Sequence, residues 1–506
     1  MSTNSAGTPA VPHPTPHAGG ASIPGPVRIV LSVLVSTAFV MMLNETTLAV
    51  ALPSIMADYA ISAATAQWLL TGFMLTMAVV LPATGWLLER FTTRAVFVFA
   101  TAAFLVGTVM AALAPSFALL IVARVAQAVG TAVIMPLLMT VTMTLVPALR
   151  RGSVMGLIAV VMAVGPALGP TVAGLVLSVT TWHGIFWVMT PLVALAGVAG
   201  AVRLTTVGEP RATPLDLLSV VLSVLAFGGL VYGLSSIGVI TGGGPAGRAG
   251  LIVLAVGVVG LVLFVWRQLD RGRKDRALLD LRPLATRNFT VSLLVLMGLF
   301  AAMLGVLNTL PLYLQGSLLV TALVAGLVLL PGGLLEGALS PFVGRIYDRR
   351  GPRPLIVPGM VLVAGSLCGL ATVDENTAVE PVIALHIVFS IGLALLFTPL
   401  MTTALGSLPK HLYSHGSAIL NTLQQLAGAA GTAVMITVYS GVAAAAQADG
   451  APEPVALADG ANSAFLASAF VAGVALLLSL FITRIPSATD RGRTSTEESP
   501  TAPAHR

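Results

Sequence analysis

The chain has 506 residues, of which 57% are hydrophobic and only 9% are charged, and its mean hydropathy is +0.98. Soluble domains carry about 25% charged residues, so this chain has too little polar surface to be soluble and is an integral membrane protein. Its single cysteine, Cys368, excludes an internal disulfide and a cysteine metal site, and we expect it to be a small buried apolar residue. We expect no metal and no cofactor.

Fourteen apolar segments are long enough to cross a bilayer, for which about 20 helical residues suffice. They are residues 28–52, 66–88, 95–114, 117–142, 152–178, 183–204, 216–237, 249–267, 289–314, 320–344, 354–373, 380–402, 416–443 and 461–484. Unpaired backbone groups cannot face lipid, so we predict that these segments are helices. Their continuous apolar runs exclude a β-barrel, whose strands alternate between apolar and polar residues.

The basic residues predict the orientation of these helices. If the N-terminus lies in the cytoplasm, all but two of the 25 Lys and Arg residues fall on inner loops, inner helix ends or tails. The exceptions are Arg124 and Arg248. Basic residues favour the cytoplasmic side, and an even number of spans then places both termini there. The net charge of +6 is therefore explained by topology, and we expect no nucleic-acid partner.

The predicted domains follow from this topology and from an internal repeat. They are a disordered cytoplasmic tail (1–27), a six-helix bundle (28–204), two extra transmembrane helices (205–267), a charged cytoplasmic link (268–288), a second six-helix bundle (289–484) and a second disordered tail (485–506). Glycine, an acid–arginine pair and further bases recur at 85–94 and 344–353. Repeated halves are typical of secondary transporters. We expect the link to be a solvated connection and Asp216 to be a helix N-cap.

The repeated loops resemble the Gly-x-x-x-(Asp/Glu)-Arg signature of the major facilitator superfamily, and the span count resembles its fourteen-span drug:proton antiporter branch. The resemblance implies an all-α fold of two six-helix bundles plus two extra central helices. It also implies a latch that holds the halves in the outward-open state, although the loops could be ordinary inner-loop charges. The latch residues would be Gly85, Glu89, Arg90, Arg94, Gly344, Asp348, Arg349 and Arg353. The first copy departs from the usual pattern at Glu89 and Thr92.

The fifth span carries a second motif, which resembles the antiporter signature Gly-x-x-x-Gly-Pro-x-x-Gly-Gly. The matching residues are Gly165, Gly169, Pro170 and Gly174. Ala173 stands where the signature has a further glycine. Small residues let membrane helices approach closely and prolines bend them, so the alternative is a generic packing helix. The signature belongs to exporters, and the resemblance therefore favours efflux over uptake.

The first and fourth spans carry charged residues within motifs. In the fourth span, Arg124 begins a sequence that resembles the family's Arg-x-x-Gln-Gly motif. The first span resembles Leu-Asp-x-Thr-(Ile/Val)-Val-Asn-Val-Ala-Leu-Pro, but Asn44 replaces the aspartate and the acid is Glu45. This version, together with residues 414–425 in the thirteenth span, resembles the lincomycin-resistance-type subgroup.

Only two acids, Glu45 and Glu336, lie well inside the predicted spans, and an acid in a membrane is by default a functional group. Burial raises the pKa of a carboxylate and a nearby cation lowers it, so such a group can take up a proton in one state and release it in another. Glu45 and Arg124 each lie seven residues from the outer end of their spans, at a depth of about 10 Å. We predict a direct or water-bridged pair in which Glu45 carries the proton and Arg124 tunes it. The alternative is a static buried pair.

Other polar groups within the spans are candidates for the substrate cavity. Glu336, at about 22 Å from the outer surface and in the inner half, is either a cation-binding acid or a structural acid. The remaining candidates are Asn421, Gln424, Gln425, Met42 and Asn308. Each of them could line the cavity or contact a neighbouring helix.

These features predict a membrane transporter and not an enzyme, because the sequence contains no phosphate-binding loop. The expected activity is proton-coupled antiport, in which amphipathic, often cationic, drugs are exported from the cytoplasm by alternating access. The alternatives are a dedicated exporter of one native metabolite, antibiotic or lipid, and, from another class, a non-transporting sensor or scaffold. The expected partners are small amphipathic molecules, protons and membrane lipid. We expect a monomer in the inner membrane of a bacterium.

Overall fold

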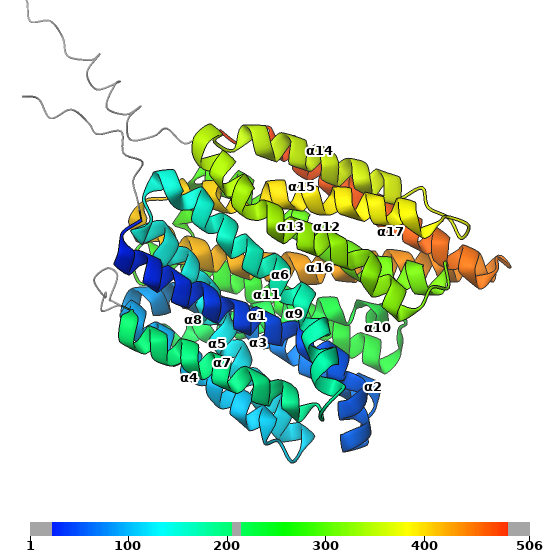
Figure 1. Ribbon diagram of the computed structural model, residues 1–506, viewed down its shortest axis with the longest axis horizontal. Coiled ribbons are helices and arrows are strands. Elements are labelled where there is room, and N and C mark those ends of the chain that lie inside the picture. Colours follow the sequence, from blue (N-terminus) through cyan, green and yellow to red (C-terminus); the bar gives the residue numbers. More distant parts are fainter. Residues whose placement is uncertain (1–22, 205–213, 484–506) are drawn as a thin grey trace, which may run out of the picture.

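The computed structural model describes residues 23–204 and 214–483 (Figure 1). Within these ranges, fourteen helices are long and apolar enough to cross a membrane, which confirms the predicted class and number. The predicted tail 485–506 lies outside the described residues, as does nearly all of the tail 1–27.

The helices agree with the predicted spans apart from their ends. They are α1 (Gly25–Tyr59), α2 (Ala63–Ala66), α3 (Trp68–Arg90), α4 (Thr93–Ala112), α5 (Phe117–Leu145), α6 (Arg151–Leu177), α7 (His183–Arg203), α8 (Leu217–Ser223), α9 (Gly229–Ser235), α10 (Ile237–Thr241), α11 (Gly244–Gly272), α12 (Arg287–Gly316), α13 (Ala322–Arg350), α14 (Arg353–Leu370), α15 (Val379–Gly406), α16 (Tyr413–Ala448) and α17 (Glu453–Ser479). Short 3-10 segments are η1 (Ala148–Arg150), η3 (Arg282–Ala285) and η4 (Lys410–Leu412), and η2 (Val224–Gly228) is a π-helical turn between α8 and α9.

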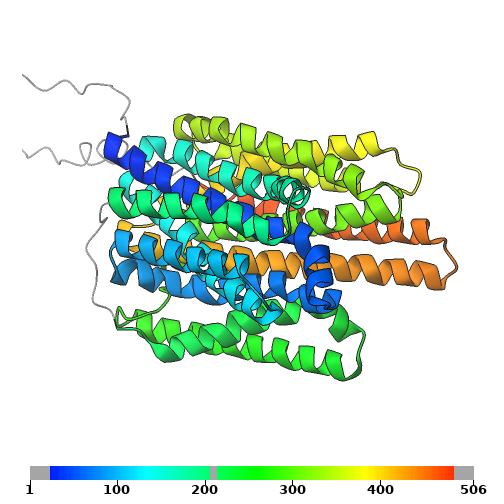
Figure 2. The same cartoon turned by 60° about the horizontal axis from the view of Figure 1, so that its bottom comes forward.

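The two predicted halves meet most extensively through α6 and α13. The extra helices, α8 to α11, lie along one side of the bundle against α3 and α16 (Figure 2). They therefore touch one helix from each predicted half, at the seam between the halves. The chain that leaves α11 also reaches that seam.

The two ends of the bundle differ in charge. We call the end at which α1 begins and α3, α13 and α17 finish the basic end, and the opposite end the distal end (left and right in Figure 1). The last turns of α3 and α13 at the basic end carry Arg90, Arg349 and Arg350.

The predicted end of the first span, at residue 52, is wrong. Helix α1 continues through Pro53 to Tyr59 and ends where Ala60 adopts a left-handed conformation with φ of 50°. Proline removes one backbone donor, but membrane helices tolerate it where neighbouring groups compensate. The expectation for Cys368 is also wrong, since this residue is exposed on the outer surface of α14.

Asp216 occupies the N-cap position of α8, as predicted, but its side chain makes no capping bond. Instead, Arg267 donates two hydrogen bonds of 2.8 Å to the carboxylate, and the Arg271 Nε lies 3.3 Å from it. The hydrogen bond from Arg267 is the main reason that the pKa of Asp216 falls to about 2. An ion pair therefore fastens α8 to α11 at the basic end.

The link 268–288 is partly buried, and the expectation of a solvated connection is wrong there. Gln268 is fully buried, and Leu278, Leu279 and Asp280 are each less than 5% exposed. Apolar residues in the middle of the link leave water when they pack against the helix ends, which offsets the cost of ordering the chain.

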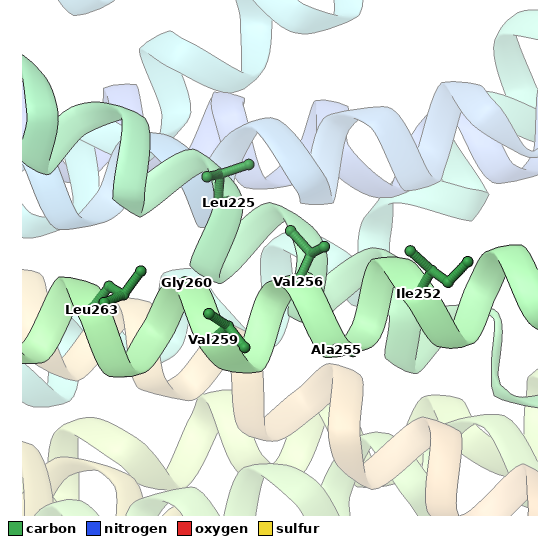
Figure 3. Close-up of a pocket in the computed structure, with 7 residues that line it drawn as sticks. All are labelled: Leu225, Ile252, Ala255, Val256, Val259, Gly260 and Leu263. Atoms are coloured by element: carbon green, nitrogen blue, oxygen red, sulfur yellow. The ribbon is translucent and has the colours of Figure 1, made fainter.

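An apolar groove of about 330 Å³ lies between α11 and η2 (Figure 3). Leu225, Val256, Gly260 and Leu263 line it. Ile252, Val259 and other α11 side chains at this groove are largely exposed, so the groove belongs to the outer surface of the extra helices.

Candidate functional site

A buried polar network surrounds Arg124 on α5, whose side chain is 1% exposed. Its Nη1 donates to the amide oxygens of Asn44 (3.3 Å) and Gln127 (2.9 Å), and its Nε donates to the carbonyl of Leu69 (3.3 Å). The guanidinium lies 4.2 Å from the centre of the Phe73 ring, within cation–π range. Neutral groups from α1, α3 and α5 therefore hold a permanent positive charge.

Asn44, and not Glu45, is the direct partner of Arg124 on α1. Asn44 is fully buried, whereas Glu45 is turned away by about 100° and is half-buried. No salt bridge joins Glu45 to Arg124 among the residues described. The direct ion pair, one of the two predicted arrangements, is therefore wrong in this conformation.

Glu45 and Arg124 lie on helices that touch at this point, since Asn44 contacts Arg124 directly. Along its helix, Glu45 lies about 20 Å from the end of α1 at Tyr59, and Arg124 lies about 10 Å from the distal end of α5. The ring of Tyr59 lies 6.4 Å from that of Phe117, the first residue of α5, so the two helices end close together.

Helix α6 approaches α1 through two glycines of the antiporter motif. A side chain at Gly165 would crowd Met42, and one at Gly169 would overlap Thr46. These two glycines therefore allow close helix contact, as the resemblance implies. Gly174 has no neighbouring atom that would meet an added side chain, so close packing does not explain a glycine at that position.

Residues close to the two membrane acids in sequence contact α6 at neighbouring positions. On the α13 side, Gly337 packs against Val164, and Glu336 directly precedes Gly337. On the α1 side, Met42 packs on Gly165, and Glu45 lies about one turn further along α1.

Glu336 lies at the middle of α13, which runs from Ala322 to Arg350. It is half-buried. Ser340 Oγ donates to its backbone carbonyl at 2.7 Å, but its carboxylate has no hydrogen-bond partner within the described chain. An unpaired acid in the middle of a membrane-spanning helix is chemically available to a proton or a cation.

The polar residues of α16 face helices of the other predicted half. Asn421 donates to the sulfur of Met139 on α5 at 3.4 Å, and Gln425 donates to the sulfur of Met77 on α3 at 3.8 Å. Gln424 is 3% exposed, and its Nε2 has no partner among the described residues. Their predicted role in a substrate cavity remains a prediction, as does that of Met42.

Asn308 lies apart from these groups, on the exposed side of α12. Its Nδ2 donates to the carbonyl of Leu304 at 2.7 Å and to Thr432 on α16 at 3.4 Å. It thus ties α12 to α16, and its assignment to the cavity likewise remains a prediction.

The second latch copy joins the halves through Asp348 on α13. Its carboxylate accepts from the backbone N–H groups of Gly152 (2.7 Å) and Ser153 (2.8 Å) and from the Ser153 hydroxyl (2.5 Å). These donors form the first turn of α6, whose helix dipole favours an anion. Gly344 lies against the backbone of Gly152, so the two helices are in close contact here.

The first latch copy makes a different contact. Glu89 Oε1, at the end of α3, lies 3.3 Å from Nε2 of His415 near the start of α16. Gly85, one turn earlier on α3, leaves room for the imidazole, which an added side chain would overlap.

The latch arginines take no part in salt bridges with these acids, within the part of the chain that the structure describes. Arg353 Nε donates to the carbonyl of Ile482 at 3.2 Å, while Arg94 and Arg349 are exposed. In this conformation the two latch acids therefore contact α6 and His415 and not the latch arginines.

Hydrogen bonds between the two predicted halves gather toward the basic end. Besides the latch contacts, the Thr140 and Ser417 hydroxyls lie 2.8 Å apart, and Arg151 donates to the Tyr413 hydroxyl at 3.3 Å. At the distal end, the hydrogen bonds of described residues stay within one half, as when Tyr59 donates to a carbonyl of the α4–α5 loop at 2.8 Å. The basic end is the closed one.

Sequence reasoning missed the roles of Asn44 and His415. Asn44 was recognisable only as a replaced aspartate, and His415 only as part of a motif without a stated function. Thr108, which accepts from Gln127 at 3.0 Å and completes the Arg124 network, carries no sequence signal.

Comparison with known proteins agrees with this architecture. Residues 34–432 match the family model of the major facilitator superfamily. The chain is 41% identical over 462 residues to the lincomycin resistance protein LmrB of Listeria monocytogenes, covering 90% of this chain and 97% of the relative. It is 39% identical to LmrB of Bacillus subtilis, covering 90% and 96%.

A solved structure shows the same fold at low sequence identity. The proton:xylose symporter XylE superposes with a TM-score of 0.64 at 14% identity, covering 90% of this chain and 96% of that one. The fourteen spans and the bacterial relatives place the chain in a bacterial inner membrane. It belongs to the major facilitator superfamily and is a fourteen-span membrane transporter, not an enzyme.

Proposed function

We propose that this transporter is a proton-coupled antiporter that exports amphipathic, often cationic, drugs by alternating access. The observation that carries the proposal is the placement of Glu45, a half-buried acid without a hydrogen-bond partner among the described residues, directly after Asn44, whose amide oxygen accepts from the fixed charge of Arg124. The names of the relatives, lincomycin resistance proteins, support export of a drug.

The basic end faces the cytoplasm in this proposal. Positively charged loops are retained on that side, and the closed latch then makes the conformation outward-facing. The substrate would leave from the distal end, and protons would enter there. We expect the protein to act as a monomer, since its two halves supply both sides of the pathway.

The fixed charge of Arg124 links the protonation of Glu45 to the binding of the drug. An arginine cannot release its proton in a protein, so its charge is constant while that of Glu45 changes. Protonating Glu45 removes one negative charge next to Arg124, and a cationic drug bound near the acid has the same electrostatic effect. Proton and drug therefore compete for one site, and binding of the proton from outside favours release of the drug.

Glu336 is a second acid within a membrane-spanning helix, in the C-terminal half. It directly precedes Gly337, which packs against α6 at Val164, and its carboxylate is likewise unpaired among the described residues. We propose that it contacts the cationic group of the substrate. Glu336→Gln should then reduce transport of the cation ethidium more than that of a neutral drug, and equal losses would count against this role.

Everted membrane vesicles with an imposed pH gradient, acidic inside, test the main proposal. The wild-type protein should accumulate lincomycin or ethidium when the gradient is applied, and Glu45→Gln should abolish this uptake while the protein remains in the membrane. Glu380→Gln is the matched control, because Glu380 is an exposed acid in the first turn of α15. Undiminished gradient-driven uptake by Glu45→Gln would refute the proposal.

The same assay separates the alternatives. Transport of a single compound from a broad panel would indicate a dedicated exporter of a metabolite, antibiotic or lipid. A wild-type protein that moves no member of the panel would favour a sensor or scaffold.

A further inference from the structure

The chain between α11 and α12 is built into the basic end of the bundle. We call residues 277–282 the strap. Ala277, Leu278 and Leu279 are 9%, 1% and 3% exposed, and Asp280 is 4% exposed. Four consecutive buried residues in a connection of mostly charged sequence are unusual, because charged residues normally stay in water unless they are paired.

One attachment of the strap is to the end of the second extra helix. The Leu279 N–H donates to Oε1 of Gln268 at 3.1 Å, and Gln268 Nε2 donates to Ser219 on α8 at 2.8 Å. Gln268 is fully buried and uses both ends of its amide. The strap is thereby connected to both extra helices.

The other attachment is to His415 on α16. The Asp280 N–H donates to Nδ1 of His415 at 3.2 Å, so Nδ1 is an acceptor and the imidazole proton lies on Nε2. Nε2 can then donate to Glu89, which lies 3.3 Å away. One imidazole, 5% exposed on its side chain, therefore connects the strap, α16 and the first latch copy on α3.

The strap is also held in shape by its own charges. Arg282 bridges Asp280 and Asp275, the latter at 2.8 Å. A cavity of about 430 Å³ lies beside these groups, and its lining includes Ala277, Glu89 and His411. Strap, latch and η4 therefore meet at one cavity that opens at the basic end.

We propose that the strap is a third part of the gate at the basic end, and that His415 is the positioning residue that joins it to the latch. The extra helices would thus act on the transport cycle through the strap, which moves with α16 away from α3 when this end opens. This inference rests on the proposed function for its transport readout, but the contact itself can be tested without transport.

Two substitutions separate the two bonds of His415. His415→Asn retains an acceptor near the position of Nδ1 and loses the donor to Glu89. His415→Gln retains a donor near the position of Nε2 and loses the acceptor for Asp280. A purely structural role for the histidine would make both variants fail together.

Thiol labelling reports the strap directly. A single cysteine replaces Ala277 in a Cys368→Ser background. The protein is then treated with a membrane-impermeant maleimide that is supplied from the basic end. His415→Gln should raise its labelling rate by about three- to tenfold, the fold-change that one net hydrogen bond corresponds to, and His415→Asn should raise it less. Arg276→Ala, at an exposed strap neighbour, is the control and should have no effect. Equal rates in all variants would overturn the proposal.

Cross-linking then tests whether the strap must move. Cysteines at Glu89 and Ala277, both at the 430 Å³ cavity, are joined by a cleavable bifunctional reagent, and transport is compared before cross-linking, after it and after cleavage. We expect a reversible loss of turnover with little change in KM, while cysteines at His411 and Ala277 should cross-link without loss. Unchanged turnover with both pairs would refute the gating role. Absence of transport by the wild-type protein would instead contradict the proposed function, and the labelling rates would still decide the strap contact.

Discussion

The two latch copies share a sequence pattern but make contacts of different kinds. In the second copy, Asp348 accepts three hydrogen bonds from the first turn of α6. In the first copy, the side-chain contact of Glu89 that the structure describes is with His415, which is also held by the strap. The second copy is thus a direct lock between helices, whereas the first depends on a segment that only the extra helices supply.

This difference teaches that a repeated motif need not have a repeated function. A carboxylate at a helix N-terminus has several N–H donors and a favourable dipole, so Asp348 needs no further support. Glu89 has a single donor, and that donor is positioned by another chain segment. The two copies should therefore respond unequally to equivalent substitutions.

Loss of the Asp348 carboxylate should have the largest effect. Asp348→Ala removes three bonds to an ionised acceptor, and hydrogen bonds to charged groups contribute about 1.5–3 kcal/mol each. We expect the closed state to be weakened by more than 3 kcal/mol in total, seen as faster labelling of a cysteine at Thr140 from the basic end. Ser153→Ala removes one of the three hydrogen bonds and should have a much smaller effect. An equal effect would show that the three hydrogen bonds do not contribute independently to the closed state.

The ion pair of Asp216 and Arg267, which fastens α8 to α11 before the strap begins, should give the next largest effect. The pKa of Asp216 is lowered to about 2, chiefly by its hydrogen bond to Arg267, from an ordinary value near 3.9. A lowered pKa contributes stability that is complete above about pH 4 and is lost as the pH falls through about 2.

The measurement is amide exchange in α8. Asp216→Asn should weaken protection there by about 2 kcal/mol at neutral pH, with no further change when the pH is lowered to 3. In the wild-type protein, protection should be constant between pH 5 and 8. Equal protection in both proteins would show that the ion pair of Asp216 does not stabilise α8.

Glu89 should be more tolerant than Asp348. Glu89→Ala loses a single bond and should weaken the closed state by about 1 kcal/mol, whereas Glu89→Gln keeps an acceptor for His415 Nε2 and should stay close to wild type. Cysteine labelling at Thr140 reads out both variants. A loss for Glu89→Ala as large as that for Asp348→Ala would remove the distinction between the copies.

The latch arginines should have the smallest effect on the closed state. Arg94→Ala and Arg349→Ala remove exposed charges without salt bridges in the described chain, and such substitutions usually change stability by less than about 0.5 kcal/mol. The same labelling assay should show rates near wild type. A large increase would mean that these arginines act in the closed state through groups other than Glu89 and Asp348.

The sequence predicted the fold well because hydropathy and length determine membrane helices. All fourteen spans were found, and the largest boundary errors were at α17, which begins at Glu453 and not at 461, and at α1, which Pro53 does not end. The motifs also point to helices that contact one another, since α1 meets α5 at Arg124 and meets α6 at Gly165 and Gly169. The rotation of α1 could not be predicted, because it depends on how its whole face packs; one residue separates Asn44 in the network from Glu45 outside it.

The burial of the strap could not be predicted from its composition. Charged residues surround Leu278 and Leu279 and made the whole link look solvated, and nothing in the spacing connects Asp280 to a histidine 135 residues away. Such contacts between distant segments are fixed by tertiary packing, which a single sequence does not display. The partner of Asp216 was missed for the same reason, because Arg267 lies 51 residues further along the chain.

Proton release on drug binding tests the central claim, that Glu45 carries the exchanged proton. Lincomycin or ethidium is added to the purified protein in weakly buffered solution, and a pH indicator reports the protons released. We predict release from the wild-type protein and from Glu380→Gln, and none from Glu45→Gln even though that variant still binds the drug. Unchanged release from Glu45→Gln would contradict the claim and transfer the role to another group.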